Sequence, residues 1–250
     1  MGGGYTAEEM MIVAAARMLR DGEVVFVGIG LPNLACNLAR RLHAPHLILI
    51  YEAGVIGARP RRLPLSIGDP ALVSGSLAVI PMFDLFAFYL QRGRIDVGFL
   101  SGAQVDRFGN LNATVIGNYR RPRARLPGSG GAAEIAAWAG RFYVIMPHEP
   151  RRFPERCDFC TAPGFLEGGD ARERAGLIGK GPAAVITDLG LLQPDASGEL
   201  ILTAVHPGVS VETVRERTGW PLRVSPDLEV LPSPTQEELS ALRALRGSAP

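Results

Sequence analysis

Residues 47–54 place a single carboxylate at the end of an apolar run. Four branched apolar residues, 47–50, are followed by Tyr51, Glu52, Ala53 and Gly54. Such a run is typical of a buried strand in a parallel sheet, and open α/β sheets bind ligands at the carboxyl ends of their strands. Glu52 is therefore predicted to face a ligand, and Gly54 permits a sharp turn there. A solvated carboxylate, or one that caps a neighbouring helix, would account for a lone Glu equally well.

Two glycines stand between a predicted strand and a predicted helix. Gly28 and Gly30 follow the strand, and Glu52 ends the next strand a little over 20 residues later. A nicotinamide dinucleotide site has this arrangement, with the acid on the ribose. Pro32 inside the turn and Asn33 at the third glycine position oppose that interpretation, because the third glycine permits close helix–strand packing. A tight turn and an anion site at the helix N-terminus stay open as alternatives.

A second glycine-rich segment leads into a helix expected at residues 132–139. It consists of Gly128, Gly130 and Gly131 around one serine and runs into Ala132, and no Lys-Ser/Thr pair follows, so it is not a P-loop. N–H groups at a helix start can receive an oxyanion or a phosphate, although a plain turn explains the glycines equally well.

Arginines precede this segment. Their forked side chains suit phosphate or a substrate carboxylate, and a solvated face is the alternative. RNA binding is unsupported, because only Tyr119 interleaves with the cluster. Its members are Arg120, Arg121, Arg123 and Arg125.

Residues 102–112 form a polar segment that is expected to be a loop. It contains Gln104 and Asn110, and it is too polar for a core and too specific for a generic linker. Its Asn, Gly and Asp residues either make turns or order the loop against a ligand.

The composition is that of a folded globular protein. Of 250 residues, 47% are hydrophobic and 20% are charged, and the formal net charge is +1. We expect one domain over residues 1–250 with a peripheral tail from about residue 232, and no field that attracts nucleic acid or an anionic membrane. No apolar run approaches the roughly 18 residues of a membrane span, no signal peptide opens the chain, and a myristoylation pattern at residues 1–6 is short enough to arise by chance.

Three cysteines do not make a disulfide framework, so the reducing cytoplasm is the expected compartment. Cys157 and Cys160 form a single CxxC pair, and the four histidines are scattered. A structural zinc site needs four ligands, so we expect no metal.

Strand and helix patterns alternate nearly throughout. They predict an α/β fold with an open, largely parallel sheet flanked by helices. A polar, proline-rich connector is expected at residues 59–69. The expected strands are residues 23–27, 47–51, 78–80, 97–100, 142–146, 183–187 and 200–205, and the expected helices are 7–20, 34–42, 83–91, 132–139, 211–218 and 236–245.

Taken in order, the motifs resemble the β subunit of class I coenzyme A transferases, most closely the glutaconate CoA-transferase type. The resemblance covers nearly the whole chain and implies the three-layer CoA-transferase (NagB-like) fold. It rests on GIGLP at 28–32, EAG at 52–54, LPLSIGD at 63–69, GAQVDRFGNLN at 102–112, GSGGA at 128–132, HEPRRF at 148–153 and PGVS at 207–210.

The resemblance implies that Glu52 is the nucleophile. Its carboxylate would attack an acyl-CoA thioester and become a glutamyl-CoA thioester by way of an anhydride. The oxyanion and CoA contacts would come from Gly128, Gly130, Gly131 and Ala132. The substrate pocket would include Gly28, Gly30, Asn33, Ala53, Gly54, Gln104 and Asn110. Contacts with phosphate or carboxylate by Arg121, Arg123 and Arg125 are an inference beyond the family motif.

A separately encoded α subunit is implied as the partner, in a hetero-tetramer or larger assembly. The substrates would be acyl-CoA and a small acid, with no tightly bound cofactor; glutaconate-like, 3-oxo dicarboxylic, 3-methylglutaconyl and steroid-ring-derived acyl groups all stay open. Ala53 departs from the commoner Ser or Asn of the family, which puts the positioning of the nucleophile in doubt. Acyl-CoA hydrolase or decarboxylase activity, a non-catalytic β-like subunit and dinucleotide binding are the alternatives.

Overall fold

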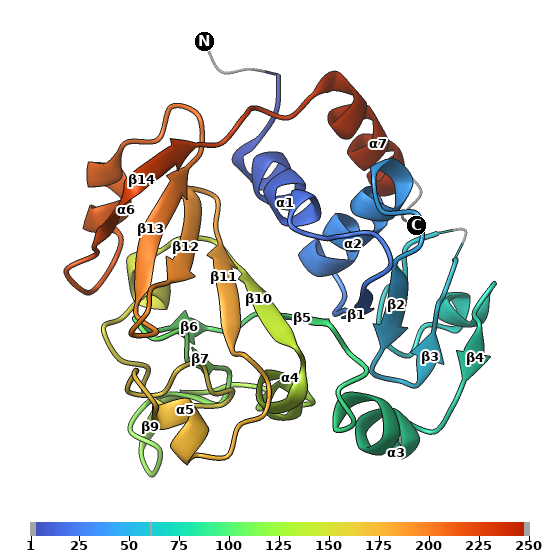
Figure 1. The fold of residues 1–250 in the computed structure, drawn as a ribbon, viewed down its shortest axis with the longest axis horizontal. Coiled ribbons are helices and arrows are strands. Elements are labelled where there is room, and N and C mark those ends of the chain that lie inside the picture. The colour runs from blue at the N-terminus through green and yellow to red at the C-terminus, as the bar shows by residue number, and fades with distance from the viewer. Residues whose placement is uncertain (1–3, 61, 248–250) are drawn as a thin grey trace. The chain divides into compact units, whose positions relative to one another are not determined.

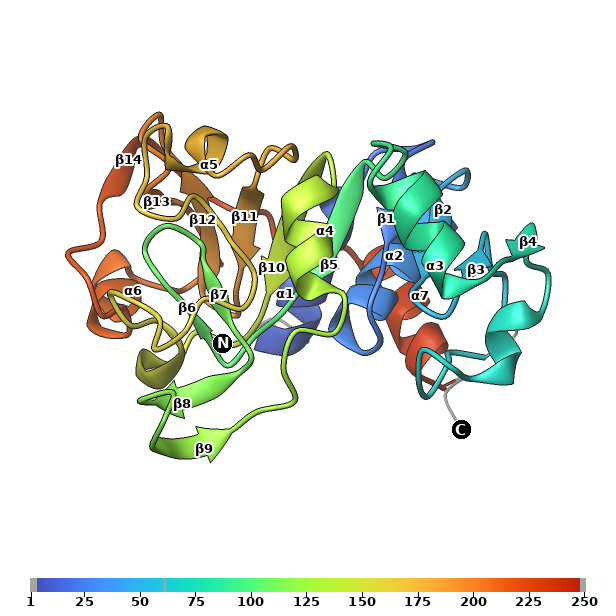
Figure 2. The ribbon, with the colours of Figure 1, turned by 90° about the horizontal axis from the view of Figure 1, so that it is seen from below.

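The structure, a computed structural model, describes residues 4–60 and 62–247. The chain divides into unit 1, Met1–Leu100 with Ser233–Pro250, and unit 2, Ser101–Pro232. Figures 1 and 2 show the ribbon from two directions. The first half of the myristoylation pattern at residues 1–6 lies outside the described residues.

Unit 1 is built on a sheet with the strand order β5-β1-β2-β3-β4. β1 (Val24–Phe26) pairs in parallel with β2 (Ile48–Tyr51) and with β5 (Val97–Leu100). β3 (Val55–Ile56) and β4 (Ala78–Val79) continue the sheet in antiparallel fashion beyond β2. The carboxyl ends of three parallel strands therefore lie at one edge of this sheet, as the apolar runs predict.

Helices pack against this sheet and against each other. α1 (Ala7–Arg17) begins with a capping box formed by Thr6 and Glu9 and ends earlier than expected. α2 (Leu31–Leu42) begins at Leu31 rather than at residue 34, because Pro32 lacks an N–H and suits a first helical turn. After the 3₁₀ turn η1 (Pro70–Val73), the expected helix at 83–91 is a short α3 (Met82–Asp84) that continues as the π-helix η2 (Leu85–Leu90).

The C-terminal helix α7 (Gln236–Gly247) belongs to unit 1. It packs against α1 and α2, as Figure 1 shows, and buries Leu239, Leu242 and Leu245. The tail that the sequence analysis treats as peripheral therefore contributes apolar side chains to the packing of this unit.

Unit 2 contains a mixed sheet with the order β14-β13-β12-β11-β10. β10 pairs in parallel with β11 and β13 with β14, whereas β11, β12 and β13 are antiparallel neighbours. Its strands are β10 (Arg141–Ile145), β11 (Pro182–Ile186), β12 (Gly190–Pro194), β13 (Leu200–Val205) and β14 (Val224–Val230). Its helices are α4 (Ala132–Trp138), η3 (Pro150–Arg152), α5 (Ala171–Arg174) and α6 (Val211–Glu216).

Two hairpins complete unit 2. β6 (Gln104–Val105) pairs with β7 (Leu111–Asn112), and β8 (Val115–Gly117) pairs with β9 (Pro122–Arg125). The expectation of a loop over residues 102–112 is therefore wrong. Strands of two residues each are too short to show the alternation of apolar and polar residues by which a strand is predicted.

The α/β class with helices on a sheet is confirmed. Antiparallel pairs are more numerous than the sequence suggests, because β3 and the hairpin strands are short, and because β12, with five residues from Gly190 to Pro194, is not among the expected strands. Within residues 4–60 and 62–247, every helix is too short or too polar to cross a bilayer.

Candidate active site

Glu52 is the second residue of the four-residue turn, residues 51–54, that joins β2 to β3. Tyr51 pairs with Val55 across the turn, and the Gly54 N–H donates to the Tyr51 carbonyl at 2.9 Å. Gly54 has φ of +97°, and a Cβ at this position would lie 1.9 Å from the Ile80 carbonyl oxygen. Only glycine fits such a closure, so Gly54 fixes where the carboxylate leaves the sheet.

The Glu52 side chain is half-buried and unengaged. Among the described residues it has no hydrogen bond or ion pair, whereas Asp69 and Asp96 of the same unit both accept backbone N–H groups. A carboxylate in this state has all its lone pairs available for a ligand.

The loop after β1 lies beside this turn. The Val27 N–H donates to the Ile50 carbonyl at 2.9 Å, which continues the β1–β2 ladder up to Gly28. α2 starts directly after Gly30, whose φ is +83°, and no side chain caps its N-terminus. Unsatisfied N–H groups and the helix dipole at this point favour an anion. The structure thus brings Gly28, Gly30, Ala53 and Gly54 to the same sheet edge as Glu52.

A buried polar chain anchors β2 to α2 behind Glu52. The Tyr51 hydroxyl and the Asn37 amide both donate to Asn33 Oδ1 at 2.8 Å. Arg40 in turn donates to Asn37 Oδ1 and to the Ala58 carbonyl, both at 2.7 Å. Burial raises the pKa of Tyr51, which keeps its hydroxyl a donor.

Asn33 is predicted from the sequence to line the substrate pocket, and its buried hydrogen bonds with Tyr51 and Asn37 are not predicted. Asn33 is 2% exposed and its Oδ1 is engaged inside the protein. The spacing of Asn33, Asn37 and Arg40 along one helix face is the signal that could have revealed them. A contact of Asn33 with substrate stays a prediction.

The second glycine segment belongs to unit 2. Gly128 donates its N–H to the Ala113 carbonyl at 2.8 Å, and Ala132 donates to the Ser129 carbonyl at 2.9 Å. The N–H groups of Gly130 and Gly131 have no acceptor among the described residues. Of the four residues predicted to contact an oxyanion or CoA, two therefore have backbone donors available.

The polar residues of the β6–β7 hairpin are buried and paired. Asn110 donates to Asp106 and to the Leu166 carbonyl, and its oxygen accepts the N–H of Gly164 at 2.8 Å. Gln104 exchanges hydrogen bonds with Asp158. The judgement that this segment is too polar for a core is wrong, because distant partners satisfy each polar group. A substrate contact by Gln104 or Asn110 stays a prediction.

The predicted arginine cluster lies on the β8–β9 hairpin. Arg121 and Arg123 are exposed and pair with no carboxylate within the described part of the chain. The Arg125 guanidinium lies 4.6 Å from the centre of the Tyr119 ring, which stacks on Phe159. The hairpin therefore presents unpaired positive charge to solvent.

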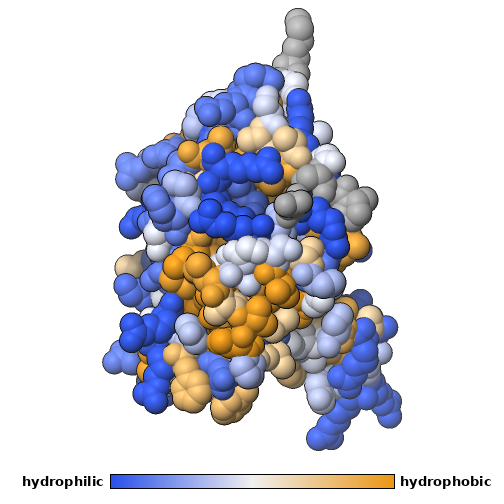
Figure 3. Space-filling model, turned by 90° about the vertical axis from the view of Figure 1, so that its right-hand side faces the viewer, coloured by the Kyte–Doolittle hydropathy of each residue, from blue (hydrophilic) through white to orange (hydrophobic). Residues whose placement is uncertain are grey.

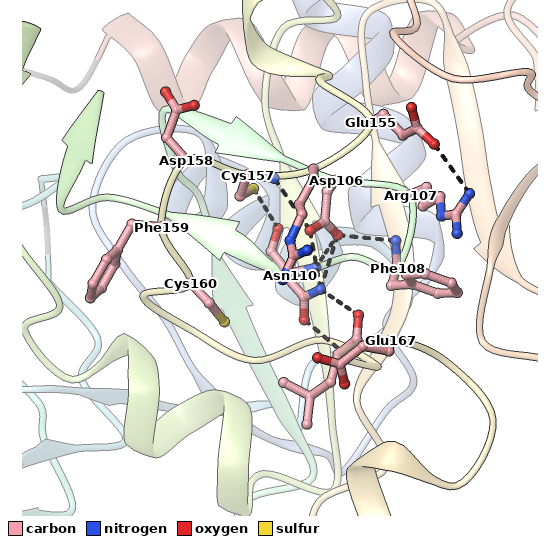
Figure 4. Close-up of a pocket in the computed structure, with 12 residues that line it drawn as sticks. Asp106, Arg107, Phe108, Asn110, Glu155, Cys157, Asp158, Phe159, Cys160 and Glu167 are labelled. Atoms are coloured by element: carbon pink, nitrogen blue, oxygen red, sulfur yellow. Dashed lines mark hydrogen bonds and ion pairs between the residues drawn. The ribbon is translucent and has the colours of Figure 1, made fainter. Parts of the chain in front are cut away.

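A cavity of about 660 Å³ in unit 2 is lined in part by both cysteines of the CxxC pair. Figure 4 draws the residues around it. The Cys157 thiol donates to the Asn110 carbonyl at 3.2 Å. Burial raises the pKa of Cys160 to about 11 and that of Cys157 further still. Both thiols are protonated at neutral pH, which opposes thiolate chemistry. Over the residues that the structure describes, no three His, Cys, Asp or Glu side chains gather as metal ligands.

Comparison with known proteins agrees with this architecture. The model of the coenzyme A transferase family matches residues 8–217. A 3-oxoadipate CoA-transferase subunit from Pseudomonas knackmussii is 53% identical over 242 residues, which are 96% of this chain and 93% of that subunit.

Two solved structures extend the comparison. The glutaconate coenzyme A-transferase of Acidaminococcus fermentans superimposes with a TM-score of 0.91 at 37% identity, over 96% of this chain and 94% of that one. The decarboxylase AibA/AibB gives a TM-score of 0.82 at 30% identity, over 96% and 94%. The resemblance inferred from the motifs is confirmed, and the chain belongs to the coenzyme A transferase family.

Proposed function

We propose that the chain is the β subunit of a heteromeric CoA-transferase and that Glu52 carries CoA between two acids. The observation behind this is the unpaired, half-buried Glu52 carboxylate on a turn that Gly54 closes, in a chain of the CoA-transferase family. A nucleophilic carboxylate has to be unhindered, and a side chain without internal partners meets this condition.

The reaction proceeds in two symmetric halves. The Glu52 carboxylate attacks the thioester carbonyl of the donor, the C–S bond breaks, and an acyl–glutamyl anhydride and CoA thiolate form. The thiolate then attacks the glutamyl carbonyl of the anhydride, which releases the donor acid as its carboxylate and leaves a glutamyl-CoA thioester. The acceptor carboxylate repeats these steps in reverse. Covalent catalysis thus divides one difficult exchange into easier steps.

Each attack places negative charge on a carbonyl oxygen. The N–H groups of Gly130 and Gly131, which lack an acceptor within the described residues, are suited to receive such an oxyanion. The uncapped start of α2 provides a second source of positive potential, at the sheet edge that carries Glu52. The mechanism uses these backbone dipoles and needs no metal or resident cofactor.

A 3-oxo dicarboxylic acid is the proposed acyl group. The similarity at 53% identity to a subunit named for 3-oxoadipate supports this choice. A second carboxylate on the substrate, or the CoA phosphates, would be matched by Arg121, Arg123 and Arg125, of which Arg121 and Arg123 pair with no carboxylate in the described residues. The partner is a CoA-transferase α subunit, assembled with this chain as a hetero-tetramer or larger in the cytoplasm.

Decarboxylation or hydrolysis of acyl-CoA is the second candidate. The likeness to the decarboxylase AibA/AibB favours it, since one scaffold carries both chemistries. Ala53, beside the proposed nucleophile, also lacks the polar group of the Ser or Asn that is commoner in the family and that could hold the acceptor acid.

Trapping of the intermediate tests the proposal. The chain, co-purified with its α subunit, is incubated with 3-oxoadipyl-CoA, glutaconyl-CoA or acetyl-CoA and reduced with borohydride, and the peptide containing Glu52 is analysed by mass spectrometry. Reduction of Glu52 to the alcohol, dependent on one acyl-CoA, is expected, and the other glutamate peptides are internal controls. Consumption of acyl-CoA with an unmodified Glu52 would reject the glutamyl thioester and support the second candidate. A Glu52→Gln variant should give no reduced peptide.

A further inference from the structure

An apolar face of unit 1 lies open to solvent between residues 65 and 88. Within the part of the chain that the structure describes, eleven large hydrophobic side chains are exposed, and eight of them fall in this stretch. Figure 3 shows apolar side chains gathered into a patch on this side of the molecule. The apolar face consists of Leu65, Ile67, Val73, Leu77, Val79, Met82, Phe83 and Phe88, which are between 39% and 73% exposed.

We propose that the apolar face is the docking surface of the α subunit. This inference rests on the proposed function and adds the surface by which the partner completes the site. Single soluble chains seldom expose a contiguous apolar patch larger than a few hundred Å², whereas a standard interface takes roughly 800 Å² from each partner and has an apolar centre.

The face is held in place from behind. On the helix formed by α3 and η2, Leu85 and Leu90 are fully buried, and the Phe86 ring meets Phe26 of β1 edge to face at 5.5 Å. Phe83 and Phe88 project from the same helix and contact each other edge to face at 6.4 Å. Because the core fixes the helix, the two exposed rings stay presented, as expected of aromatic anchors at an interface.

The face adjoins the Glu52 turn. The Ile80 N–H donates to the Gly54 carbonyl at 3.0 Å, and the Ile80 carbonyl oxygen covers the Gly54 α-carbon. Val79 and Met82, on either side of this contact, belong to the apolar face. A protein seated on the face therefore lies directly beside the turn that carries the nucleophile, where it can close the site against water.

Charge selects the α subunit over a second copy of this chain. Residues 59–60 and 62–94 contain four arginines and two aspartates, a formal net charge of +2, and Arg59, Arg92 and Arg94 are exposed. Two copies docked through the same face would bring these like charges together, which costs affinity. The complementary partner has an apolar centre with an acidic rim, and such a partner also leaves the arginines paired.

Substitution on the face tests the docking surface. Leu77→Asp and Phe83→Asp replace side chains that are 72% and 73% exposed, and Ile178→Asp and Val230→Asp are matched controls in unit 2 at 68% and 67%. Each variant is first checked for an unchanged thermal unfolding curve, and binding to the cognate α subunit is then measured by analytical ultracentrifugation. Each face variant should raise Kd at least about thirtyfold, while the controls should bind as the wild type does.

The outcomes separate the docking surface from the proposed function. Face variants that assemble with the α subunit at wild-type affinity, or a homodimer through this face that the α subunit does not displace, would overturn the docking surface. A complex that the face variants disrupt, but that never yields a reduced Glu52, would leave the docking surface intact and reject the CoA-transferase mechanism.

Discussion

Two hairpin turns of this protein each contain a carboxylate and a glycine with positive φ, but the two carboxylates have different surroundings. In unit 1 the turn of residues 51–54 closes with Gly54 at φ of +97°, and in unit 2 the turn of residues 106–109 closes with Gly109 at φ of +71°. In each, the glycine N–H donates to a carbonyl three residues earlier, at 2.9 Å. Glu52 is the second residue of its turn, whereas Asp106 is the first residue of its own.

That one-residue difference decides what each carboxylate does. A short carboxylate at the first position of a turn reaches the N–H groups that follow it. Asp106 Oδ1 accepts from the N–H groups of Phe108 and Asn110 at 3.0 and 3.1 Å, and the Asn110 amide binds both of its oxygens. Glu52, one position later and one methylene longer, has no such partner within the described residues. Asp106 therefore organises its hairpin, whereas the Glu52 carboxylate stays available to a ligand, as the proposed role of nucleophile requires.

Exchanging each carboxylate for its amide should separate these roles most strongly. Glu52→Gln is expected to lower CoA transfer by on the order of a thousandfold or more, with the free energy of unfolding unchanged, because the nucleophile is lost and no contact is broken. Asp106→Asn is expected to cost about 2 kcal/mol of stability, because the new NH₂ group faces N–H donors. A transfer assay on the αβ complex and urea unfolding of each variant measure the two effects.

A stable Asp106→Asn protein without turnover would break the comparison, since Asp106 would then act in the chemistry. Unfolding of the Glu52→Gln variant at a lower urea concentration than the wild type would also contradict the comparison, because it would show that Glu52 has a structural partner.

The buried hydrogen bonds among Tyr51, Asn33 and Asn37 allow a second test of the comparison, with smaller expected effects than Glu52→Gln. Asn33→Ala leaves the Tyr51 hydroxyl without its acceptor and removes one of the two acceptors of the Asn37 amide, which keeps the Asn33 carbonyl. We therefore expect a loss of about 2 kcal/mol in stability and roughly tenfold in kcat, with KM little changed. Tyr51→Phe removes one donor while Asn37 still binds Asn33, and it should cost about 1 kcal/mol. Steady-state kinetics and thermal unfolding give the values.

Asn33→Asp is the matched control, because it keeps an acceptor oxygen for Tyr51. Recovery of kcat in this variant is expected. An Asn33→Ala enzyme with wild-type kcat would show that the chain stabilises the fold without positioning Glu52.

Local signals make part of this structure predictable. The start of the first helix at residue 7, the apolar run before Glu52 and the strand at residues 97–100 each depend on neighbours in sequence, and all lie where expected. The expected start of α2 is three residues late, because a proline inside a turn and a proline that opens a helix look alike in the sequence.

The polar core of unit 2 could not be predicted in the same way. Asn110 is satisfied by Gly164 and Leu166, more than 50 residues away, and Gln104 by Asp158. A sequence shows only that these groups are polar, and burial becomes tolerable once distant partners arrive. Likewise, a glycine-rich segment suggests several N–H donors, and the turn made by Ala132 and Ser129 decides which remain available.

Glu9 offers the smallest and most selective test, because it is a carboxylate held by an arginine. The hydrogen bond from Arg243, followed by the Thr6 N–H, lowers the pKa of Glu9 to about 2 from 4.5. A folded-state pKa below the unfolded one stabilises the protein above about pH 4.5, and this contribution is lost as the pH falls toward 2. Arg243→Ala should therefore lower stability by less than about 1 kcal/mol at neutral pH, since Arg243 is 47% exposed, and the gap should close near pH 2. Arg174→Ala, which breaks an exposed pair with Asp170, should change nothing measurable. Thermal unfolding of the three proteins across this range decides the matter: a gap for Arg243→Ala that stays constant to pH 2 would mean that packing of the arginine, and not the charge of Glu9, holds α7 against α1.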